Sequence, residues 1–147
     1  NANLLIVGND EENIKNIILA KNINYKDKIH FENFTNNPEQ YMAAADLFCL
    51  PSYREGFGMA AVEAGSCGLP VITSRIYGLT DAVEEGVTGL MHPPGDILSI
   101  KKCIEYLITN KEKRYLLGRN AIIRNKNLFS NLLIEKDFLK FLKEKLV

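Results

Sequence analysis

Two glutamates and two glycines in one stretch are the residues of this sequence best suited to chemistry. Glu55, Gly56 and Gly58 stand close together, and Glu63 follows roughly two helical turns after Glu55. Glycine lacks a Cβ atom, so a ligand can approach the backbone closely and the chain can adopt positive φ. Carboxylates repel phosphate but accept hydrogen bonds from sugar hydroxyls. These residue types therefore favour a ligand that carries both a phosphate and hydroxyl groups.

The surrounding sequence predicts a strand, a loop, a helix and a second strand. Residues 45–50 are an apolar run ended by Pro51, residues 57–67 have helical content, and residues 71–73 are a β-branched run entered through Pro70. The glycine loop then follows the carboxyl end of a strand, where open α/β sheets bind ligands. Unpaired N–H groups at the helix start favour a phosphate there. From the residues alone we expect a phosphorylated sugar or nucleotide; a plain loop with two solvated glutamates is the alternative.

Apolar patterns elsewhere predict more strands and helices of an α/β fold. Leu4–Val7 has the form of a parallel strand covered on both faces, and residues 28–31 and 89–92 read as further strands. Asn9-Asp10 and Asp96 are suited to cap the helices that follow them. His30 and His92 fall in strands, where we expect structural roles. Apolar residues at helical spacing predict three helices, each with one face that packs on the core. The three faces are Ile14, Ile17 and Ile18; Ile97, Ile100, Ile104, Leu107 and Ile108; and Tyr115, Leu116, Ala121 and Ile122.

Composition excludes several classes of function. The 147 residues are one domain's worth, with 18 basic and 18 acidic side chains, so no net field recruits nucleic acid or membrane. No apolar run approaches the roughly 18 residues of a spanning helix, so we predict neither a signal peptide nor a membrane span. Cys49, Cys67 and Cys103 lack metal or redox spacing. We expect them to be buried, reduced thiols of a cytoplasmic protein.

Residues 51–70 carry an ordered pattern: Pro-Ser, Glu-Gly-Phe-Gly, a second Glu that closes a Glu-x7-Glu motif, and Gly-x-Pro-Val. This pattern resembles the signature of the group-1 family of retaining glycosyltransferases with the GT-B fold. Further segments match the family's order and spacing over about residues 4–109: Val7-Gly8, Ile29-His30-Phe31, Ala45-Asp46-Leu47, Gly86-x-x-Gly89-Leu90 and Pro93-Pro94-Gly95-Asp96. The resemblance implies a Rossmann-like, mostly parallel sheet flanked by helices, one half of a GT-B fold. That half is the carboxyl-terminal, donor-binding domain.

The resemblance also implies roles for individual residues. Glu55 would bind the donor sugar's hydroxyls and stabilise the cationic transition state, and Glu63 would accept hydrogen bonds from the ribose. The diphosphate would meet the backbone amides of a short loop: Gly56, Phe57, Gly58 and Met59. Thr35 stands where the family's base-binding loop falls, although turn chemistry explains it as well. Arg75 is suited to a phosphate contact, although it also reads as a solvated charge.

As a member of this family, the intact enzyme would move a sugar from a nucleotide diphosphate sugar to an acceptor hydroxyl with retention. Polysaccharide or glycoconjugate synthesis is the expected setting. The sequence contains no Asp-x-Asp pair to hold a divalent metal, so we expect neither a metal nor a cofactor. We expect the chain, residues 1–147, to be a piece of this enzyme that is inactive alone.

The chain also departs from the family pattern. The family's donor domain begins with one more strand and helix, which bear an Arg and a Lys, and this strand and helix do not precede Leu4. Asp10 and Asn33 stand where family members commonly have glycine, and Asp81 stands where they usually have glutamate. We therefore predict a sheet with a gap, neighbours that close up, or a strand borrowed from another chain. We expect residues 131–147 to form a helix that packs on the amino-terminal acceptor domain. Its basic amphipathic pattern leaves open a peripheral contact with the inner face of a membrane.

Two other functional classes remain as alternatives. A nicotinamide-dependent oxidoreductase needs Gly-x-Gly-x-x-Gly, but no third glycine follows Gly56 and Gly58 at the required place. A non-catalytic module that binds a nucleotide-sugar or a partner has the same residues as a donor domain. Nucleotide binding without turnover would identify that module.

Overall fold

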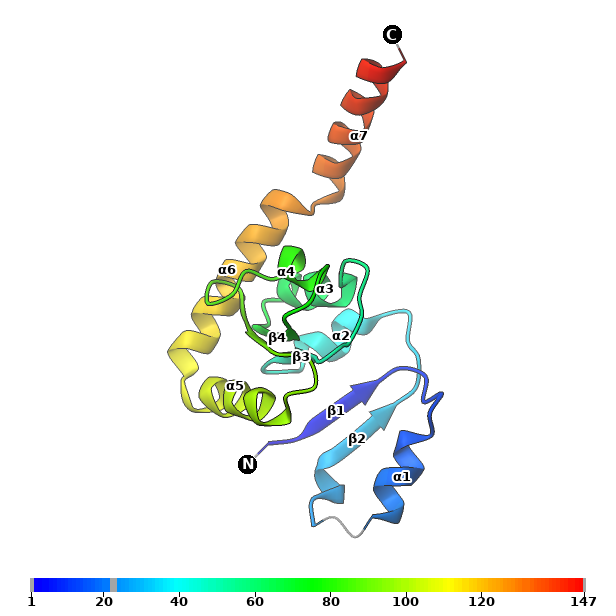
Figure 1. Ribbon diagram of the computed structural model, residues 1–147, viewed down its shortest axis with the longest axis vertical. Coiled ribbons are helices and arrows are strands. Elements are labelled where there is room, and N and C mark those ends of the chain that lie inside the picture. The colour runs from blue at the N-terminus through cyan, green and yellow to red at the C-terminus, as the bar shows by residue number, and fades with distance from the viewer. Residues whose placement is uncertain (1, 22–23, 147) are drawn as a thin grey trace. The chain divides into compact units, whose positions relative to one another are not determined.

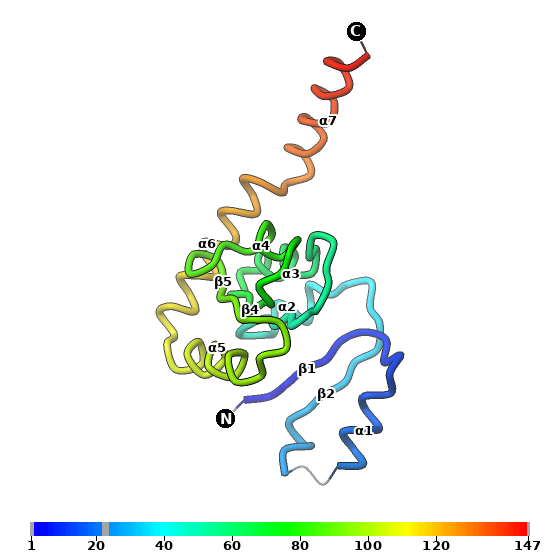
Figure 2. The backbone as a smooth tube through the Cα atoms, viewed as in Figure 1, coloured from blue at the N-terminus to red at the C-terminus, as the bar shows by residue number. Residues whose placement is uncertain are grey.

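A computed structural model describes residues 2–21 and 24–146 of the chain. It divides into two compact units, Asn1–Pro38 and Glu39–Val147. Each unit is formed by consecutive elements of the chain (Figures 1 and 2).

The amino-terminal unit holds one pair of parallel strands. β1 (Leu4–Val7) leads through α1 (Ile14–Ala20) and a short 3-10 turn (Lys26–Lys28) to β2 (Ile29–Glu32). The strands pair in register, with Leu4 opposite Ile29 and Val7 opposite Glu32. The two carboxylate oxygens of Asp10 accept the N–H groups of Ile14 (2.7 Å) and Lys15 (2.9 Å), as a helix cap does, although Asn13 and not Asp10 occupies the N-cap position of α1.

The prediction that β1 is covered on both faces is wrong. Leu4 is 50% exposed and Leu5 39%. Within the described residues, β2 is the one strand bonded to β1, which leaves the other edge of β1 unpaired. A continuous apolar run predicts a strand but does not supply the layers that would cover it.

The carboxyl-terminal unit is built on a parallel three-stranded sheet with the order β3-β4-β5. α2 (Pro38–Ala43) begins at the boundary between the units. The other elements follow in order: β3 (Phe48–Leu50), α3 (Met59–Ser66), β4 (Val71–Ser74), α4 (Leu79–Ala82), β5 (Gly89–His92), α5 (Ile97–Thr109), α6 (Lys111–Leu128) and α7 (Asn131–Lys145).

The central strand β4 separates two apolar clusters, because successive side chains of a strand point to opposite faces. Val71 packs with α3 and α4, whose core residues include Val62 and Leu79. Ile72 packs with Leu107 of α5 and Leu117 of α6. All four residues of β4 are buried. Helices therefore cover both faces of this sheet, as the α/β prediction requires.

The described strands form two sheets rather than one, and no described hydrogen-bonded ladder joins β1 or β2 to the β3-β4-β5 sheet. The predicted gap, closed-up neighbours or borrowed strand therefore stay predictions. The described residues do not form a complete six-stranded sheet.

Several local predictions need correction. β3 begins at Phe48 rather than at residue 45, because the amides of Ala44 and Ala45 bond to carbonyls at the end of α2. Ile97 is 77% exposed and lies off the packed face of α5. Cys67 is exposed at the end of α3, whereas Cys49 and Cys103 are half-buried.

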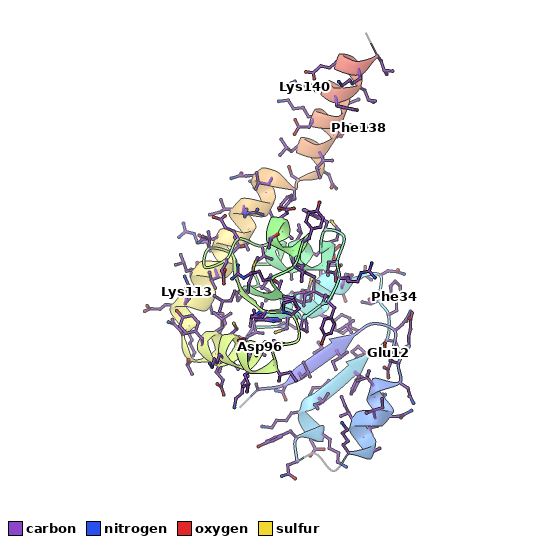
Figure 3. The ribbon with its side chains drawn as sticks, in the orientation of Figure 1. Glu12, Phe34, Asp96, Lys113, Phe138 and Lys140 are labelled. Carbon is purple, nitrogen blue, oxygen red and sulfur yellow. The ribbon has the colours of Figure 1, made fainter. Side chains whose placement is uncertain are left out.

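Helices α6 and α7 also differ from the predicted packing. The buried residues of α6 are not Tyr115, Leu116 or Ile122; besides Ala121 they are Leu117, Gly118 and Asn125. α7 extends away from the three-stranded sheet (Figures 1 and 2) and has no buried residue. Phe138 and Lys140 project from opposite sides of α7 (Figure 3). Among the described residues, no helix is long and apolar enough to span a bilayer.

Candidate functional site

The loop after β3 holds Glu55 in a fixed position. Ser52 Oγ donates a hydrogen bond to Glu55 Oε1 over 2.8 Å, and the Glu55 side chain is half-buried. Pro51 ends the strand, so the chain turns at its carboxyl end and brings the hydroxyl and the carboxylate together. The sequence prediction gave Ser52 no role. A short hydroxyl side chain three residues before an acid was the signal for this contact.

Gly58 directly precedes α3, and its position leaves no room for a side chain. Its φ is 75°, in the left-handed region that favours glycine. A Cβ atom at this position would collide with Cδ2 of Leu79, which is fully buried in α4. Gly58 O accepts hydrogen bonds from Ala61 N (2.9 Å) and Val62 N (3.3 Å). This geometry lets α3 begin immediately after the loop.

The first turn of α3 leaves backbone amides for a ligand. The N–H groups of Met59 and Ala60 have no carbonyl one turn earlier in the helix, and Gly58 has no side chain to cap them. These amides carry the positive end of the helix dipole. The site therefore combines donors for an anion with the carboxylate of Glu55, one loop away.

The loop after β4 packs on the backbone of the glutamate loop. Gly78 has a φ of 88°, and a Cβ atom there would meet the carbonyl oxygen of Gly56 and lie 2.9 Å from that of Glu55. Gly56 itself has open space, since no atom lies within 4 Å of a Cβ built on it. Gly78 is thus needed for packing, and Gly56 leaves room for an approaching group.

Glu63 is exposed on the second turn of α3, while the buried side of the helix is made of small residues. Gly65 lets α6 come close, because a Cβ atom there would lie 2.8 Å from Nδ2 of Asn125. Partial burial, and then the charges of Glu39 and Glu63, raise the pKa of the Cys67 thiol. Because the Glu63 side chain is exposed, its carboxylate is accessible to hydroxyl groups of a ligand.

The structure brings Glu55, Gly56, Phe57, Gly58, Met59 and Glu63 together on one loop and the helix that it opens. Arg75, in the loop after β4, forms an ion pair with Glu85, and its side chain is half exposed. Thr35 belongs to the amino-terminal unit, where its hydroxyl accepts a hydrogen bond from Asn37 N over 3.0 Å. The predicted phosphate contact of Arg75 and base contact of Thr35 stay predictions.

Buried polar side chains lie at the carboxyl ends of β4 and β5. His92 Nδ1 lies 2.8 Å from the carbonyl oxygen of Pro93, which can only accept a hydrogen bond, so Nδ1 is the donor. Among the described residues, His92 Nε2, Thr73 Oγ1 and Ser74 Oγ have no hydrogen-bond partner. Ser74 pairs in register with His92. These three groups are buried at the carboxyl ends of the two strands.

The nearby turn into α5 confirms the predicted cap. Asp96 Oδ1 accepts the N–H of Ser99 over 3.0 Å, and its other oxygen accepts the Ser99 hydroxyl over 2.6 Å. These hydrogen bonds from Ser99 lower the pKa of the Asp96 carboxyl. Asp96 is therefore committed to the helix start and not to a ligand.

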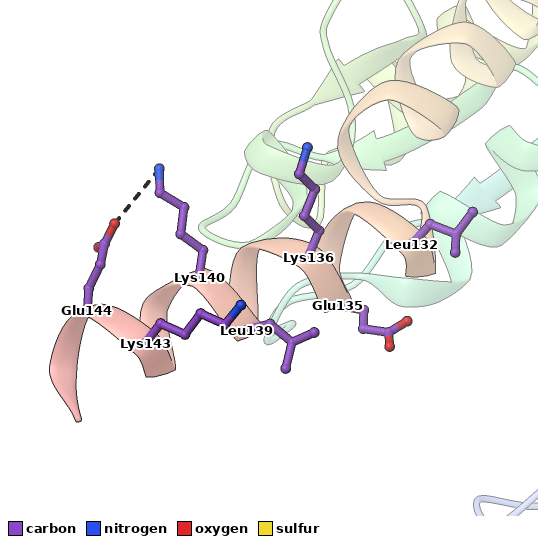
Figure 4. Close-up of a pocket in the computed structure, with 7 residues that line it drawn as sticks. All are labelled: Leu132, Glu135, Lys136, Leu139, Lys140, Lys143 and Glu144. Atoms are coloured by element: carbon purple, nitrogen blue, oxygen red, sulfur yellow. Dashed lines mark ion pairs between the residues drawn. The ribbon is translucent and has the colours of Figure 1, made fainter. Parts of the chain in front are cut away.

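Two hollows lie away from the glutamate loop. One, of about 570 Å³, is lined by α7 alone and is the exposed side of that helix (Figure 4). The other, of about 310 Å³, lies at the amino-terminal ends of β3 and β4, next to Asp46 and Arg114. Within residues 2–21 and 24–146, no cluster of three or more His, Cys, Asp or Glu side chains is arranged to hold a metal ion.

The chain as a whole is similar to known proteins. The family described as Glycosyl transferases group 1 matches residues 1–124. The chain belongs to this family. Its α/β fold of parallel strands flanked by helices is that of the GT-B carboxyl-terminal domain, as the resemblance implied.

Curated relatives of this group 1 glycosyltransferase chain include two that are similar over most of its length. The capsular polysaccharide biosynthesis glycosyltransferase CapM of Staphylococcus aureus is 35% identical over 133 residues, which cover 88% of this chain and 32% of CapM. N-acetyl-alpha-D-glucosaminyl L-malate synthase of Bacillus anthracis is 31% identical over 82% of this chain and 32% of that enzyme. The chain thus spans about a third of the length of these relatives.

Solved structures of two similar proteins superimpose closely on this chain. HepE of Anabaena in complex with UDP superimposes with a TM-score of 0.90 at 26% identity, covering 97% of this chain and 41% of HepE. HepE has also been solved in complex with UDP-glucose. Sucrose-phosphate synthase of Thermosynechococcus elongatus gives a TM-score of 0.86 at 29% identity, covering 96% of this chain and 38% of that enzyme.

Proposed function

We propose that the full-length protein transfers a sugar from a nucleotide diphosphate sugar to an acceptor hydroxyl with retention, and that this chain supplies the donor-binding half. The observation that carries the proposal is the pairing of Glu55, held by Ser52, with the unpaired amides at the start of α3. Support comes from HepE, a structural neighbour solved with UDP and with UDP-glucose.

The amides of residues 56–59 have a defined task in this proposal. Negative charge develops on the diphosphate as the bond between the sugar and the leaving group breaks. N–H donors held in place before the reaction stabilise that charge without reorganising. Gly58 and Gly78 keep the loop in this shape, because both have positive φ and a Cβ atom at either position would meet a neighbouring atom. No metal is part of the proposal, and turnover that EDTA abolishes would contradict this point.

Glu55 acts on the sugar side of the breaking bond. Its carboxylate would accept hydrogen bonds from donor hydroxyls and stabilise positive charge on the reacting carbon. The bond from Ser52 occupies Oε1 and fixes the orientation of the second oxygen, Oε2. We assign the ribose hydroxyls to the exposed carboxylate of Glu63.

Arg75 and Thr35 have weaker assignments within the proposal. Arg75 reaches a phosphate only if its ion pair with Glu85 opens, which makes it a conditional contact. Thr35 already accepts a hydrogen bond from Asn37, so a base would meet the backbone of this loop as readily as the hydroxyl.

We further propose that α7 packs on a domain that lies outside this chain. Its apolar side chains are exposed, with Leu132 at 81% and Phe138 at 59%. Lys136, Lys140 and Lys143 accompany Leu132 and Leu139 along the hollow in Figure 4. An acceptor-binding domain seated there would complete the cleft, and the 147-residue chain alone would bind donor without turnover.

The test is replacement of Glu55 by Gln in the full-length enzyme. We expect turnover to fall about a hundredfold or more, because the amide removes the charge that stabilises the transition state while keeping the shape. Circular dichroism should show an unchanged fold, and NMR of the wild-type product should show a retained anomeric configuration. Glu105→Gln, an exposed acid on α5, is the control and should not change turnover. Near-normal turnover by Glu55→Gln would contradict the role of Glu55; nucleotide binding with no turnover in the wild type would favour a non-catalytic binding module.

A further inference from the structure

Phe57, at the centre of the glutamate loop, makes a defined aromatic contact with a residue far along the chain. Its ring meets that of Phe129 edge to face, with centroids 5.2 Å apart and an interplanar angle of 79°. Both rings are half-buried and pack on the cluster that contains Val62 and Leu79. Phe129 directly follows α6 and precedes α7. The contact therefore joins the loop to the α6–α7 junction.

Phe129 also has a cation–π contact. The guanidinium of Arg124 lies over its ring, 5.1 Å from the centroid. Arg124 also donates to the carbonyls of Asp81 (2.8 Å) and Ala82 (3.2 Å) at the end of α4, and its Nε lies 3.5 Å from a carboxylate oxygen of Glu84. These contacts fix the Phe129 ring relative to the element that packs against Gly58.

The last turns of α6 are also fastened to α3. Asn125 is buried, and its Nδ2 donates to the carbonyl of Val62 (2.7 Å) and to the hydroxyl of Ser66 (3.2 Å). The N–H of Phe129 bonds to Asn125 O over 2.8 Å. The Phe129 ring is thus positioned by bonds to the same helix whose first turn opens the site.

The loop needs such an anchor because Gly56 and Gly58 flank Phe57. Glycine has the greatest backbone freedom, so a loop with two of them loses more conformational entropy when it is ordered. Phe57 is the one side chain between these glycines, and its contact with Phe129 is the aromatic contact that restrains it. Without this contact the loop would sample conformations in which the Met59 amide and Glu55 no longer face the same ligand.

We propose that Phe129 is a positioning residue for the donor site: it holds Phe57 so that the amides of residues 56–59 and Glu55 are preorganised for the diphosphate sugar. The inference rests on the proposed function. Phe129 touches no ligand in this scheme and acts through Phe57.

The experiment is a double-mutant cycle in the full-length enzyme. Phe57→Leu, Phe129→Leu and the double variant are compared for kcat/KM toward the donor sugar nucleotide and for the Kd of the nucleoside diphosphate product, with Tm measured for each. An aromatic pair contributes enough for each single variant to lower kcat/KM about three- to tenfold and to raise the Kd by a similar factor. The double variant should be no worse than the poorer single variant. Phe129→Tyr, which keeps a ring, should restore most of the loss.

Two controls separate positioning from stability and from the proposed function. Tyr115→Leu changes an aromatic side chain of α6 that is 74% exposed, and it should alter neither kcat/KM nor the Kd. A Phe129→Leu enzyme that loses Tm but keeps both constants, or two single effects that multiply in the double variant, would overturn the inference while leaving the proposed function standing. A wild-type enzyme that neither binds a nucleoside diphosphate nor transfers a sugar would overturn both.

Discussion

Two strands with similar apolar sequences, β4 and β1, have very different surroundings. In β4, Val71 and Ile72 are each 1% exposed. In β1, Leu4 is 50% exposed and Leu5 39%. β4 has a bonded strand on each side and helices on both faces, whereas within the described residues β1 is bonded to β2 alone. The difference shows that an apolar run predicts a strand, but the neighbouring layers decide its burial.

The candidate site lies on the better-packed of these two regions. Glu55 follows β3, and the helix that carries the amides packs on β4 through Val62 and its neighbours. A site that must hold donors in place before a reaction needs a rigid base. The three-stranded sheet provides that base from residues of its own unit.

The largest expected difference between the two regions is in the cost of a core truncation. Leu107→Ala removes a fully buried side chain and should lower the free energy of unfolding by about 3 kcal/mol, from lost burial and the cavity left behind. Leu4→Ala, at a half-exposed position, should cost less than about 1 kcal/mol. Urea denaturation of the 147-residue chain measures both. Equal costs would mean that β1 is as well packed as the larger sheet, and the comparison would fail.

A smaller difference in stability is expected between substitution of Gly58, which shapes the loop, and substitution of Gly56, which leaves room for a ligand. Gly58→Ala places a Cβ atom against buried Leu79 at positive φ, and it should cost about 1–3 kcal/mol of stability. Gly56→Ala, in open space, should leave thermal stability unchanged but weaken binding of a nucleoside diphosphate. Calorimetric scanning and titration of both variants provide the measurement. If Gly56→Ala destabilises the chain as much as Gly58→Ala, the distinction is wrong.

The smallest effect concerns thiol chemistry. Burial, and then the proximity of Cys103, raises the pKa of Cys49 from 9.0 to about 11, so the folded state favours the neutral thiol. This contribution to stability is present below pH 9 and is lost as the pH rises toward 11. At pH 8 a thiol reagent should label exposed Cys67 first and Cys49 only on unfolding, as followed by mass spectrometry. A cysteine introduced by Leu5→Cys should be labelled early; labelling of Cys49 at the same rate would indicate an open core.

The residue patterns predicted where helices and strands lie better than they predicted which side chains are buried. The spans of β1 and β5 and the Asp96 cap followed from local sequence, since apolar runs and turn residues act within a few positions. The exposure of Ile97 and Cys67 did not, because it depends on which helix face meets the sheet. Short apolar runs carry no information on the layers above and below them.

The candidate site shows the same division. Glu55, Glu63 and the glycine loop were predicted from a motif confined to one stretch of chain. The support from Leu79, Arg124 and Phe129 comes from distant segments, and no local pattern encodes it. Ser52 lies between these cases: its spacing to Glu55 is local, but its hydrogen bond depends on the turn that Pro51 starts.

The most direct test of the account is calorimetric titration of the full-length protein with UDP, GDP and ADP, using Glu63→Ala as the matched variant. The account predicts saturable binding of one of these nucleotides, with an affinity that Glu63→Ala lowers about tenfold through loss of the ribose hydrogen bonds. Glu105→Ala should bind as the wild type does. Absence of binding to all three nucleotides, or equal binding by Glu63→Ala, would contradict the assignment of this loop and helix as the donor site.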